Sequence, residues 1–230
     1  MERSTHDKVS TKMKTAMNEG IIQTTGISSW YDGFLYSSIM SQLTKPLAKS
    51  VAKLIREHSV VLDIGCGAGQ LAFMLSGKCK QVTGIDFSKR MVKDASKQKT
   101  KRNLVNVDFI YGDGARVSEI FSQRFNYITA MMCLHEMDYQ SRHQVITGCL
   151  KLTDQVILAD YVAPLPRNIL GWILNLIELG AGKRHYAHFK DWQKRGGING
   201  FIKQEDLNVA MRKPWQYNIV ETVIISGRNQ

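Results

Sequence analysis

The sequence of 230 residues is 43% hydrophobic and 22% charged, a balance typical of one compact globular domain with a large core. Its formal net charge of +11 favours anionic partners. The basic residues are dispersed, however, and their densest run, Lys89–Arg102, is typical of a solvated helix face, so there is no strong nucleic-acid signature. The four cysteines form no CxxC pair, which argues against both a zinc site and a disulfide framework and fits a reducing compartment.

The first 30 residues are polar and charged, and we expect them to form a helical, mobile segment with a short helix at about Val9–Asn18. They lack the apolar core of a signal peptide. The most apolar later segment, Asn168–Gly182, is too short to span a bilayer. We therefore expect a cytoplasmic protein in which residues 31–230 form a single domain.

From residue 60 onward, short apolar runs alternate with longer amphipathic stretches. The predicted strands are Val60–Ile64, Gln81–Ile85, Val105–Ile110, Tyr127–Met132 and Gln155–Tyr161. The predicted helices are a long one at about Ser37–Glu57, then Ala68–Ser76, Ser88–Thr100, a short one near Ala115–Ile120, and Tyr139–Leu150. Continuous apolar strands alternating with helices predict a doubly wound α/β fold, whose parallel sheet is covered by helices on both faces.

The pattern changes after the fifth strand, where we expect a helical lid or substrate wall at about residues 163–204. Its predicted helices are an apolar one from about Ala163 to Gly180, a second near Ala187–Lys194 and, after a Gly196–Gly197 break, a third at Ile198–Gln204. The tail predicts two strands, Asp206–Lys213 and Asn218–Ser226, joined by a turn around Pro214–Tyr217. We expect this pair to close the sheet edge as an antiparallel hairpin.

The strongest chemical signal is the run VLDIGCGAGQ, in which a hydrophobic strand enters a turn with glycine at every second position, Gly65, Gly67 and Gly69. Glycines let the backbone turn sharply and approach a ligand closely. A dinucleotide fingerprint, GxGxxG, would need its third glycine one residue later, where Gln70 stands. Asp63, inside the turn, suits a ligand with a positive charge or an amino group better than it suits a pyrophosphate.

Two further acids stand where neighbouring strands end. Asp86 is placed to accept both hydroxyls of a ribose, and Ser88 can cap the helix that follows. Asp113 can take the exocyclic amine of an adenine; by itself it would more often be a helix cap, but in series with Asp63 and Asp86 the adenine contact is the better explanation. Three acids in register at the carboxyl edge of the sheet describe a ligand with adenine, ribose and a cationic or amino-acid tail, and no phosphate.

These motifs resemble those of the class I S-adenosylmethionine-dependent methyltransferases, in particular the small-molecule branch that includes the ubiquinone/menaquinone-biosynthesis enzymes. The resemblance covers about Tyr31 to Tyr161, where VLDIGCGAGQLA matches the first family motif, GIDFS the second, DFIYGDG the third and FNYITAMMCLHEM the fourth. It implies a seven-stranded, mostly parallel sheet in the order 3-2-1-4-5-7-6, with an antiparallel C-terminal hairpin. It also implies S-adenosyl-L-methionine as methyl donor, S-adenosyl-L-homocysteine as product and a small-molecule acceptor.

The resemblance also implies a role for individual residues. Met131, Met132 and Cys133 would lie along the cofactor, and Tyr31 with Asp32 would cover it. The implied chemistry is in-line transfer of a methyl group from a sulfonium, for which positioning and desolvation supply much of the acceleration. The residues expected to bind the cofactor are Tyr31, Asp63, Gly65, Cys66, Gly67, Gly69, Asp86, Phe87, Asp113, Gly114, Met131 and Met132.

Few residues are candidates for catalysis. His135 and Glu136 follow the fourth strand, where the family places residues that face the methyl group. His135 could take a proton from the acceptor, or it could equally cap a turn. His185, Tyr186 and His188 stand together in the predicted lid. No metal is expected, because no carboxylate or cysteine has the right spacing from these lid histidines.

The apolar helix places Trp172, Leu176 and Leu179 on one side, which fits core packing, a substrate wall or a contact with an anionic membrane surface. We therefore expect an apolar or aromatic acceptor, such as a quinone or lipid. RNA or protein methylation is an alternative, although MCLHEM lacks the Asn/Asp-Pro-Pro-aromatic sequence frequent in amino-methylating enzymes. A non-catalytic cofactor-binding regulator and an NAD-dependent oxidoreductase also stay open as functions, and the sequence does not predict the oligomeric state.

Overall fold

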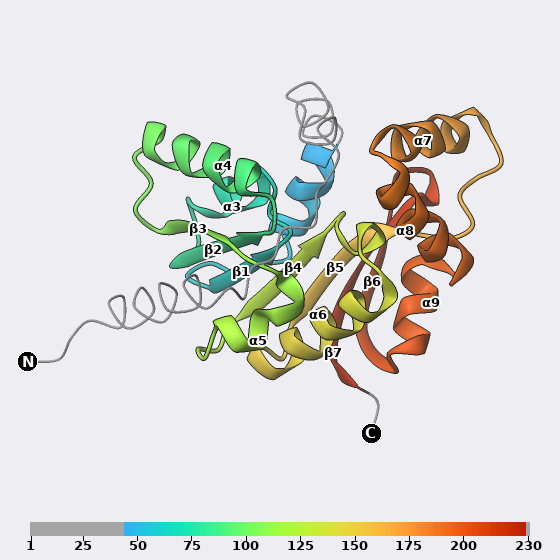
Figure 1. Cartoon of the computed structure of the whole chain (residues 1–230). Coiled ribbons are helices and arrows are strands. Elements are labelled where there is room, and N and C mark those ends of the chain that lie inside the picture. Colours follow the sequence, from blue (N-terminus) through green and yellow to red (C-terminus); the bar gives the residue numbers. More distant parts are fainter. Residues whose placement is uncertain (1–43, 229–230) are drawn as a thin grey trace, which may run out of the picture.

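The computed structural model describes residues 44–228, which form a seven-stranded sheet in the order β3-β2-β1-β4-β5-β7-β6 (Figure 1). The strands are β1 Val60–Ile64, β2 Gln81–Asp86, β3 Val107–Tyr111, β4 Tyr127–Met131, β5 Val156–Tyr161, β6 Leu207–Trp215 and β7 Val220–Arg228. The expected fold class and sheet order are confirmed. The N-terminal segment 1–30, its helix and Tyr31 lie outside the described residues.

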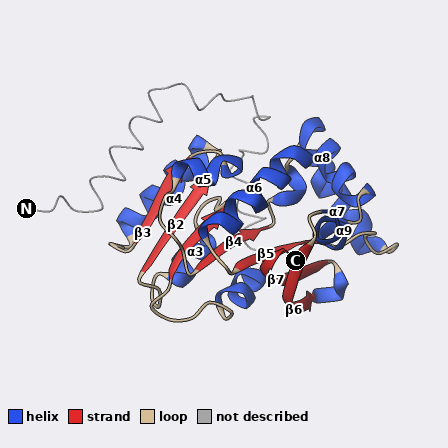
Figure 2. Ribbon diagram, turned by 90° about the horizontal axis from the view of Figure 1, so that it is seen from below, coloured by secondary structure: helices blue, strands red, loops and turns tan. Residues whose placement is uncertain are grey.

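Helices cover both faces of the sheet (Figures 1 and 2). They are α3 Gln70–Leu75, α4 Lys89–Lys101, α5 Val117–Ile120, α6 Tyr139–Leu152, α7 Ile169–Gly180, α8 Lys183–Lys194 and α9 Gly197–Gln204, with 3-10 turns η1 Gly114–Arg116, η2 Leu134–Glu136 and η3 Gln216–Asn218. Residues 44–52 are also helical, within the long helix expected before the first strand. None of the helices in the described range is both long and apolar enough to cross a membrane.

The central strands are buried on both faces, which is why their sequences are continuously apolar. All six residues of β5 are buried, and so are four of the five in β1 and in β4. The edge strand β3 is buried only at Val107. A parallel strand covered on both sides must carry apolar side chains on both faces, whereas an edge strand need not.

The C-terminal hairpin differs slightly from its expected boundaries. Strand β7 runs antiparallel between β5 and β6, as expected for a hairpin that closes the edge. However, β6 continues through Pro214, which pairs with Glu221, so the turn falls at Gln216–Asn218, later than expected. Proline is tolerated there because β6 is the outermost strand and one side of its backbone needs no ladder partner.

The strand order reverses at β1, which lies between β2 and β4. The connections on either side of this point run in opposite directions, and ligands of open α/β sheets bind in the crevice at the carboxyl edge beside such a point. In the register, Asp63 of β1 pairs with Gly84 of β2 and Thr129 of β4. The fold therefore gathers the loop after β1 and the loops after its two neighbours around one position.

Helix α8 is fixed to the sheet by Trp192, whose side chain is fully buried and whose indole N–H donates to the carbonyl of Tyr161 at 3.0 Å. Gln193 adds a bond from its amide to the carbonyl of Val162 at 3.1 Å. The helix begins at Lys183, after Gly182 in a positive-φ conformation (117°), and so starts four residues earlier than expected. His185 consequently lies on the first turn of a helix that is attached to β5.

Truncation of Trp192 tests this attachment. Trp192→Ala is expected to lower the free energy of unfolding by about 3–5 kcal/mol, because it leaves a large cavity in the core and removes a buried hydrogen bond. Denaturant unfolding followed by circular dichroism would measure the change. Lys194→Ala, exposed on the same helix, should change stability by no more than about 0.5 kcal/mol. Equal stability of the two variants would contradict the anchoring role of Trp192.

Candidate active site

The turn after β1 depends on three glycines in left-handed conformations, with φ of 64° at Gly65, 52° at Gly67 and 84° at Gly69. A Cβ at Gly65 would stand 2.6 Å from the Cβ of Cys133, and one at Gly69 would stand 2.5 Å from the ring of Phe109. A Cβ at Gly67 would meet nothing within 4 Å. Gly65 and Gly69 are therefore required by close packing, whereas Gly67 borders open space where a ligand can approach the backbone.

Asp86 fastens this turn to the end of β2. Its Oδ2 accepts the backbone N–H of Gly67 at 2.8 Å, and its Oδ1 accepts that of Ser88 at 2.8 Å. A carboxylate accepts up to about four hydrogen bonds, so Asp86 can hold the turn and bind ligand hydroxyls at once. The neighbouring Phe87 is 46% exposed, unusual for a large apolar side chain, and offers an apolar contact beside that carboxylate.

Asp63 is buried beneath the turn, where the hydroxyl of Thr129 donates to it at 2.6 Å. Burial raises the pKa of Asp63 to about 7; the hydrogen bond from Thr129 opposes this rise and the nearby charge of Asp86 adds to it. Burial penalises the charged form, so a cationic group bound nearby would favour the carboxylate. This environment suits a ligand that carries an ammonium group.

The remaining expected cofactor residues lie at the same edge of the sheet. Asp113 is exposed and accepts the N–H of Ala115 at 2.9 Å, so it caps η1, the second of the two roles that its position in the sequence allowed. Gly114 packs closely, since a Cβ there would stand 2.7 Å from Ile64. Cys66 is buried directly beside Gly65 in the turn, and burial raises the pKa of its thiol well above the usual value.

The loop after β4 is the other wall of the crevice. Met131 ends β4, and Met132 has a φ of 53°, a conformation that non-glycine residues adopt rarely. The N–H of Met132 donates to the carbonyl of Ala159 at 2.8 Å, which holds the conformation in place. Cys133 then packs against Gly65, so the two loops touch at the point where the strand order reverses.

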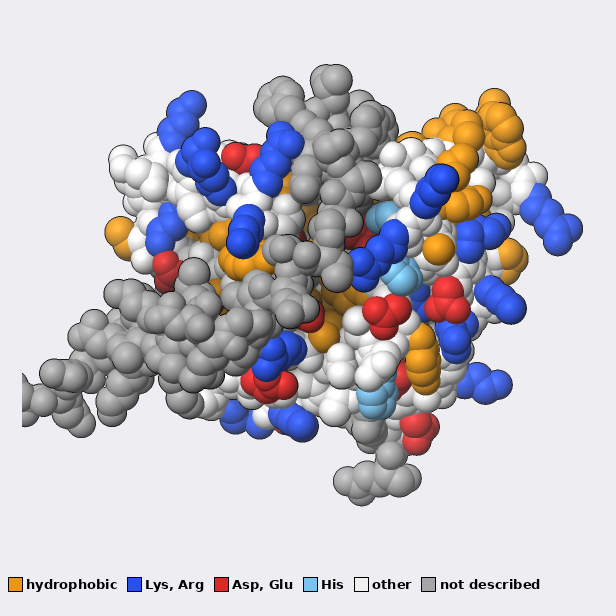
Figure 3. All heavy atoms as spheres, viewed as in Figure 1, with side chains coloured by type: hydrophobic (Ala, Val, Ile, Leu, Met, Phe, Trp, Pro, Cys, Tyr) orange, Lys and Arg blue, Asp and Glu red, His pale blue; other side chains and the backbone are white. Residues whose placement is uncertain are grey.

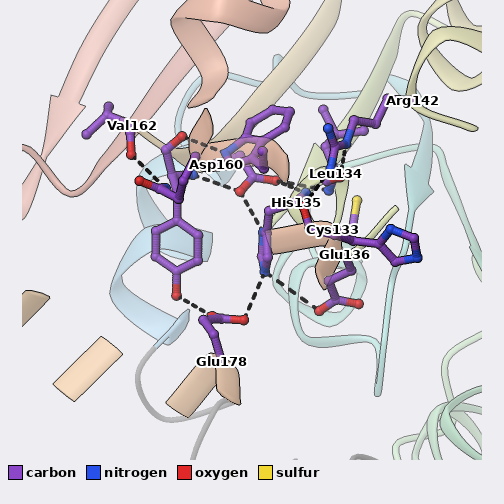
Figure 4. Close-up of polar contacts among 12 residues, drawn as sticks. Cys133, Leu134, His135, Glu136, Arg142, Asp160, Val162 and Glu178 are labelled. Carbon is purple, nitrogen blue, oxygen red and sulfur yellow. Dashed lines mark hydrogen bonds and ion pairs between the residues drawn. The ribbon is translucent and has the colours of Figure 1, made fainter. Parts of the chain in front are cut away.

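A second polar cluster follows at once, centred on His135 in η2 (Figure 4). Its Nδ1 lies 2.7 Å from Oδ1 of Asp160. Its Nε2 lies 3.7 Å from Oε2 of Glu178 and 3.9 Å from Oε1 of Glu136. His185 reaches the same Oε2 of Glu178 with its Nε2 at 2.5 Å. Donor atoms of His135, Glu136 and His185 all lie within 4.8 Å of one another, an arrangement that could hold a metal ion.

The electrostatics of this cluster do not favour His135 as a free general base. Its burial alone would lower the pKa, but the carboxylates of Asp160 and Glu178 outweigh burial and raise it to about 9. A ring that is already protonated at neutral pH does not accept another proton. In Glu178, burial raises the pKa, but the charge of His135 and the hydrogen bond from His185 outweigh it, so the pKa falls below its usual value.

Only one of the three candidate lid residues joins this cluster. His185 does so, whereas the hydroxyl of Tyr186 donates to Asn175 on α7 at 3.1 Å. His188 is half-buried, its backbone carbonyl accepts from Arg142 at 2.9 Å, and burial lowers the pKa of its ring. Tyr186 and His188 therefore connect helices, while His185 faces His135.

Three residues of this cluster were missed from the sequence: Asp160, Glu178 and Arg142. Arg142 is buried, donates from its Nε to the carbonyl of Leu134 at 2.9 Å and forms an ion pair with Asp191 at 2.9 Å. The sequence carries a weak indication of two of them. Asp160 is the one acid in the apolar run of β5 and Glu178 is the one acid in the apolar helix α7, and a single acid in an apolar segment needs a buried partner.

Comparison with known proteins adds an independent line of evidence. Residues 61–155 match a family model described as a methyltransferase domain. Over 152 residues the chain is 31% identical to demethylmenaquinone methyltransferase of Listeria monocytogenes serotype 4a (strain HCC23), a match that covers 64% of this chain and 62% of that protein. The chain thus spans about three fifths of the length of that curated relative.

Two solved structures show the same fold at low sequence identity. The PH0226 protein from Pyrococcus horikoshii OT3 superposes with a TM-score of 0.65 at 18% identity, covering 88% of this chain and 100% of that one. The O-methyltransferase NcsB1 from neocarzinostatin biosynthesis, solved with S-adenosyl-L-homocysteine and 1,4-dihydroxy-2-naphthoic acid, has a TM-score of 0.61 at 16% identity, covering 84% and 57%. Residues 61–155 thus match a methyltransferase domain, and the glycine turn, strand-end acids and sheet order are those of the class I S-adenosylmethionine-dependent methyltransferase fold.

Proposed function

We propose that the protein transfers a methyl group from S-adenosylmethionine to a small apolar or aromatic acceptor. The observation that carries this proposal is the arrangement around Gly67. The open backbone of that residue lies between Asp86, which can accept ribose hydroxyls, and the buried Asp63, whose environment favours an ammonium group. A cofactor with a diol and an amino-acid tail matches both acids.

The residues around the turn supply the polar and apolar groups that this cofactor would need. Asp86 would hold the ribose, Asp63 the amino group of the methionine tail, and Asp113 the adenine amine in addition to its cap. The exposed ring of Phe87 would contact the adenosine, and Met131 and Met132 would line the opposite wall. When bound, S-adenosylmethionine supplies an electrophilic methyl group, so the chain itself has to orient the acceptor and exclude water.

The acceptor class is supported by the helices beyond β5. An open groove of about 860 Å³ lies beside α7 and α8, and its mostly apolar lining includes Leu165, Ile169, Trp172 and Phe189. Phe189 connects this groove to the polar cluster, since its ring centroid lies 6.2 Å from that of His135. The Listeria relative is named for demethylmenaquinone, and NcsB1 was solved with a dihydroxynaphthoic acid, both of them aromatic or quinone ring systems.

The outer face of α7 supports an apolar environment for that acceptor. Five large apolar side chains at helical spacing are 46–78% exposed there, namely Ile169, Trp172, Ile173, Leu176 and Leu179. Figure 3 shows them as one hydrophobic patch with Lys and Arg side chains nearby. The inner face carries Leu170 and Leu174, which pack against the core, together with the buried Glu178, so the helix is apolar on both faces, unlike an ordinary surface helix. We propose that this face rests on an anionic membrane surface from which the acceptor enters.

The experiment that tests the function measures thermal stabilisation by S-adenosylmethionine, S-adenosylhomocysteine, NAD and NADP side by side. At a hundred times its dissociation constant, a ligand of the folded state adds about 2.7 kcal/mol, which raises the melting temperature of a domain this size by roughly 5–10 °C. We expect a shift with the two sulfur nucleosides alone. A shift with NAD alone would contradict the proposal, and binding without turnover of any quinone, phenol or lipid would favour a non-catalytic regulator.

Asp86→Ala tests the ribose contact. We expect it to weaken S-adenosylmethionine binding by roughly 1.5–3 kcal/mol, the scale of hydrogen bonds lost to a charged group. Calorimetry would measure this below the unfolding temperature of the variant, because the turn also loses its bond from Gly67. Asp94→Ala, an exposed acid on α4, is the matched control and should bind like the wild type. Unchanged affinity in Asp86→Ala would remove this residue from the site.

Replacing two apolar residues of α7 tests the membrane contact. The double change Trp172→Ser with Leu176→Ser should weaken binding to anionic phospholipid vesicles at least roughly tenfold, since each buried side chain is worth about 1.5–3 kcal/mol. Vesicle sedimentation would measure it. Val105→Ser, on the far side of the sheet and 92% exposed, serves as control and should bind as the wild type does. Equal binding by all three proteins would refute this role for α7.

A further inference from the structure

The cluster around His135 has the donor set of a transition-metal site. Donor atoms of His135, His185 and Glu136 all lie within 4.8 Å of one another. Glu178, outside that set, adds a carboxylate oxygen 3.7 Å from His135 and 2.5 Å from His185, so the four side chains come from three elements. In a tetrahedral site with bonds of about 2.0–2.1 Å, ligand atoms stand roughly 3.4 Å apart. The gaps of 3.7 Å and 3.9 Å from His135 Nε2 to the two carboxylates are close to that spacing. The ring of His185, now 2.5 Å from Glu178, would have to move outward.

The surroundings orient these ligands as the outer partners of a metal site do. Asp160 accepts from Nδ1 of His135 at 2.7 Å, so Nε2 points at the centre of the cluster. The hydroxyl of Tyr161 donates to Oε1 of Glu178 at 2.8 Å and leaves Oε2 turned toward the two histidines. A metal-bound histidine typically donates its second ring N–H to a carboxylate, and ligating carboxylates are themselves hydrogen-bonded.

The charge balance of the cluster also favours a cation. To bind an ion, His135 has to release the proton that its ring holds at neutral pH. Three carboxylates, from Asp160, Glu136 and Glu178, then surround two neutral imidazoles, and the side chains of Asp160 and Glu178 are at most 1% exposed. Burying carboxylates is costly unless they are paired, and a divalent ion would neutralise the excess of negative charge. Glu136 and His185 are 18% and 10% exposed, so an ion could enter from that side.

We propose that His135, His185, Glu178 and Glu136 bind a divalent transition-metal ion of the zinc type. Two imidazoles with two carboxylates suit Zn²⁺, Co²⁺ or Fe²⁺, whereas Mg²⁺ and Ca²⁺ prefer oxygen ligands alone. The sequence disfavoured a metal because no carboxylate had suitable spacing from the lid histidines. The fold supplies the missing carboxylates from the loop after β4 and from α7. The site adjoins the glycine turn through Cys133, so the ion would stand on the acceptor side of the crevice.

The test uses the full chain without an affinity tag, stripped of metal by a chelator. We expect one Zn²⁺ to bind per chain by calorimetry and elemental analysis, and Co²⁺ to give a visible absorption spectrum typical of nitrogen and oxygen ligands. His185→Gln retains a donor to Glu178 but cannot replace the imidazole as ligand. It should weaken Zn²⁺ binding by at least about 100-fold. Loss of a residue that only hydrogen-bonds to a ligand weakens binding by about 10–100-fold, and loss of a ligand itself should weaken it at least as much as the upper value.

The matched control is His143→Gln, on α6, where the ring pairs with Glu205 and its side chain is 49% exposed. It should bind Zn²⁺ as the wild type does. If His185→Gln unfolds, as judged by circular dichroism, Glu136→Gln replaces it, because that side chain lies at the border of the cluster. No bound ion in the wild type, or equal losses in variant and control, would overturn the proposal.

The inference does not depend on methyl transfer, and its failure can be recognised separately. Thermal stabilisation by S-adenosylmethionine involves the glycine turn and is measured on the metal-free chain. Stabilisation without Zn²⁺ binding would remove the metal site and leave the proposed function intact. Zn²⁺ binding that His185→Gln abolishes, without any response to S-adenosylmethionine, would keep the metal site and remove the proposed function.

Discussion

The polar cluster around His135 depends on one buried carboxylate, that of Asp160 in β5. It is fully buried and accepts four hydrogen bonds, from the backbone N–H groups of Leu134, His135 and Tyr161 and from the ring of His135. An isolated buried carboxylate costs several kcal/mol, and these four hydrogen bonds offset that cost. In return, the bonds fix the loop after β4 to β5 and set the direction of the His135 ring.

The two halves of the crevice meet where this loop contacts the glycine turn. On one side, Asp86 holds the turn after β1 and presents oxygens to a ligand. On the other, Asp160 holds the loop after β4, which carries residues of the second cluster. The two loops touch through Gly65 and Cys133. Groups held by the turn after β1 and groups held by the loop after β4 are therefore positioned by the same rigid sheet.

Helix α7 is apolar on both its inner and its outer face, and its one acid belongs to the same cluster. Its buried acid, Glu178, pairs with His185 and Tyr161, while large apolar side chains such as Trp172 face outward. A surface helix gains stability by burying its apolar face, so the present orientation gives up part of that gain. The inward position of Glu178 serves the proposed binding of an ion. The apolar outer surface of the helix serves the proposed binding of an apolar partner.

The sequence by itself determined the sheet, the glycine turn after β1 and the acids at the strand ends. Continuous apolar runs such as Val60–Ile64 specify buried parallel strands. An acid at the end of such a strand, such as Asp86 at the end of β2, can be located as soon as the end of the strand is known. Only the tertiary structure decided the polar cluster around His135. Asp160 and Glu178 are single acids inside apolar segments, and local periodicity does not reveal which distant group satisfies them. His135 meets Asp160 across 25 residues of chain and Glu178 across a longer stretch, because strand order and helix packing bring together groups that no local spacing relates.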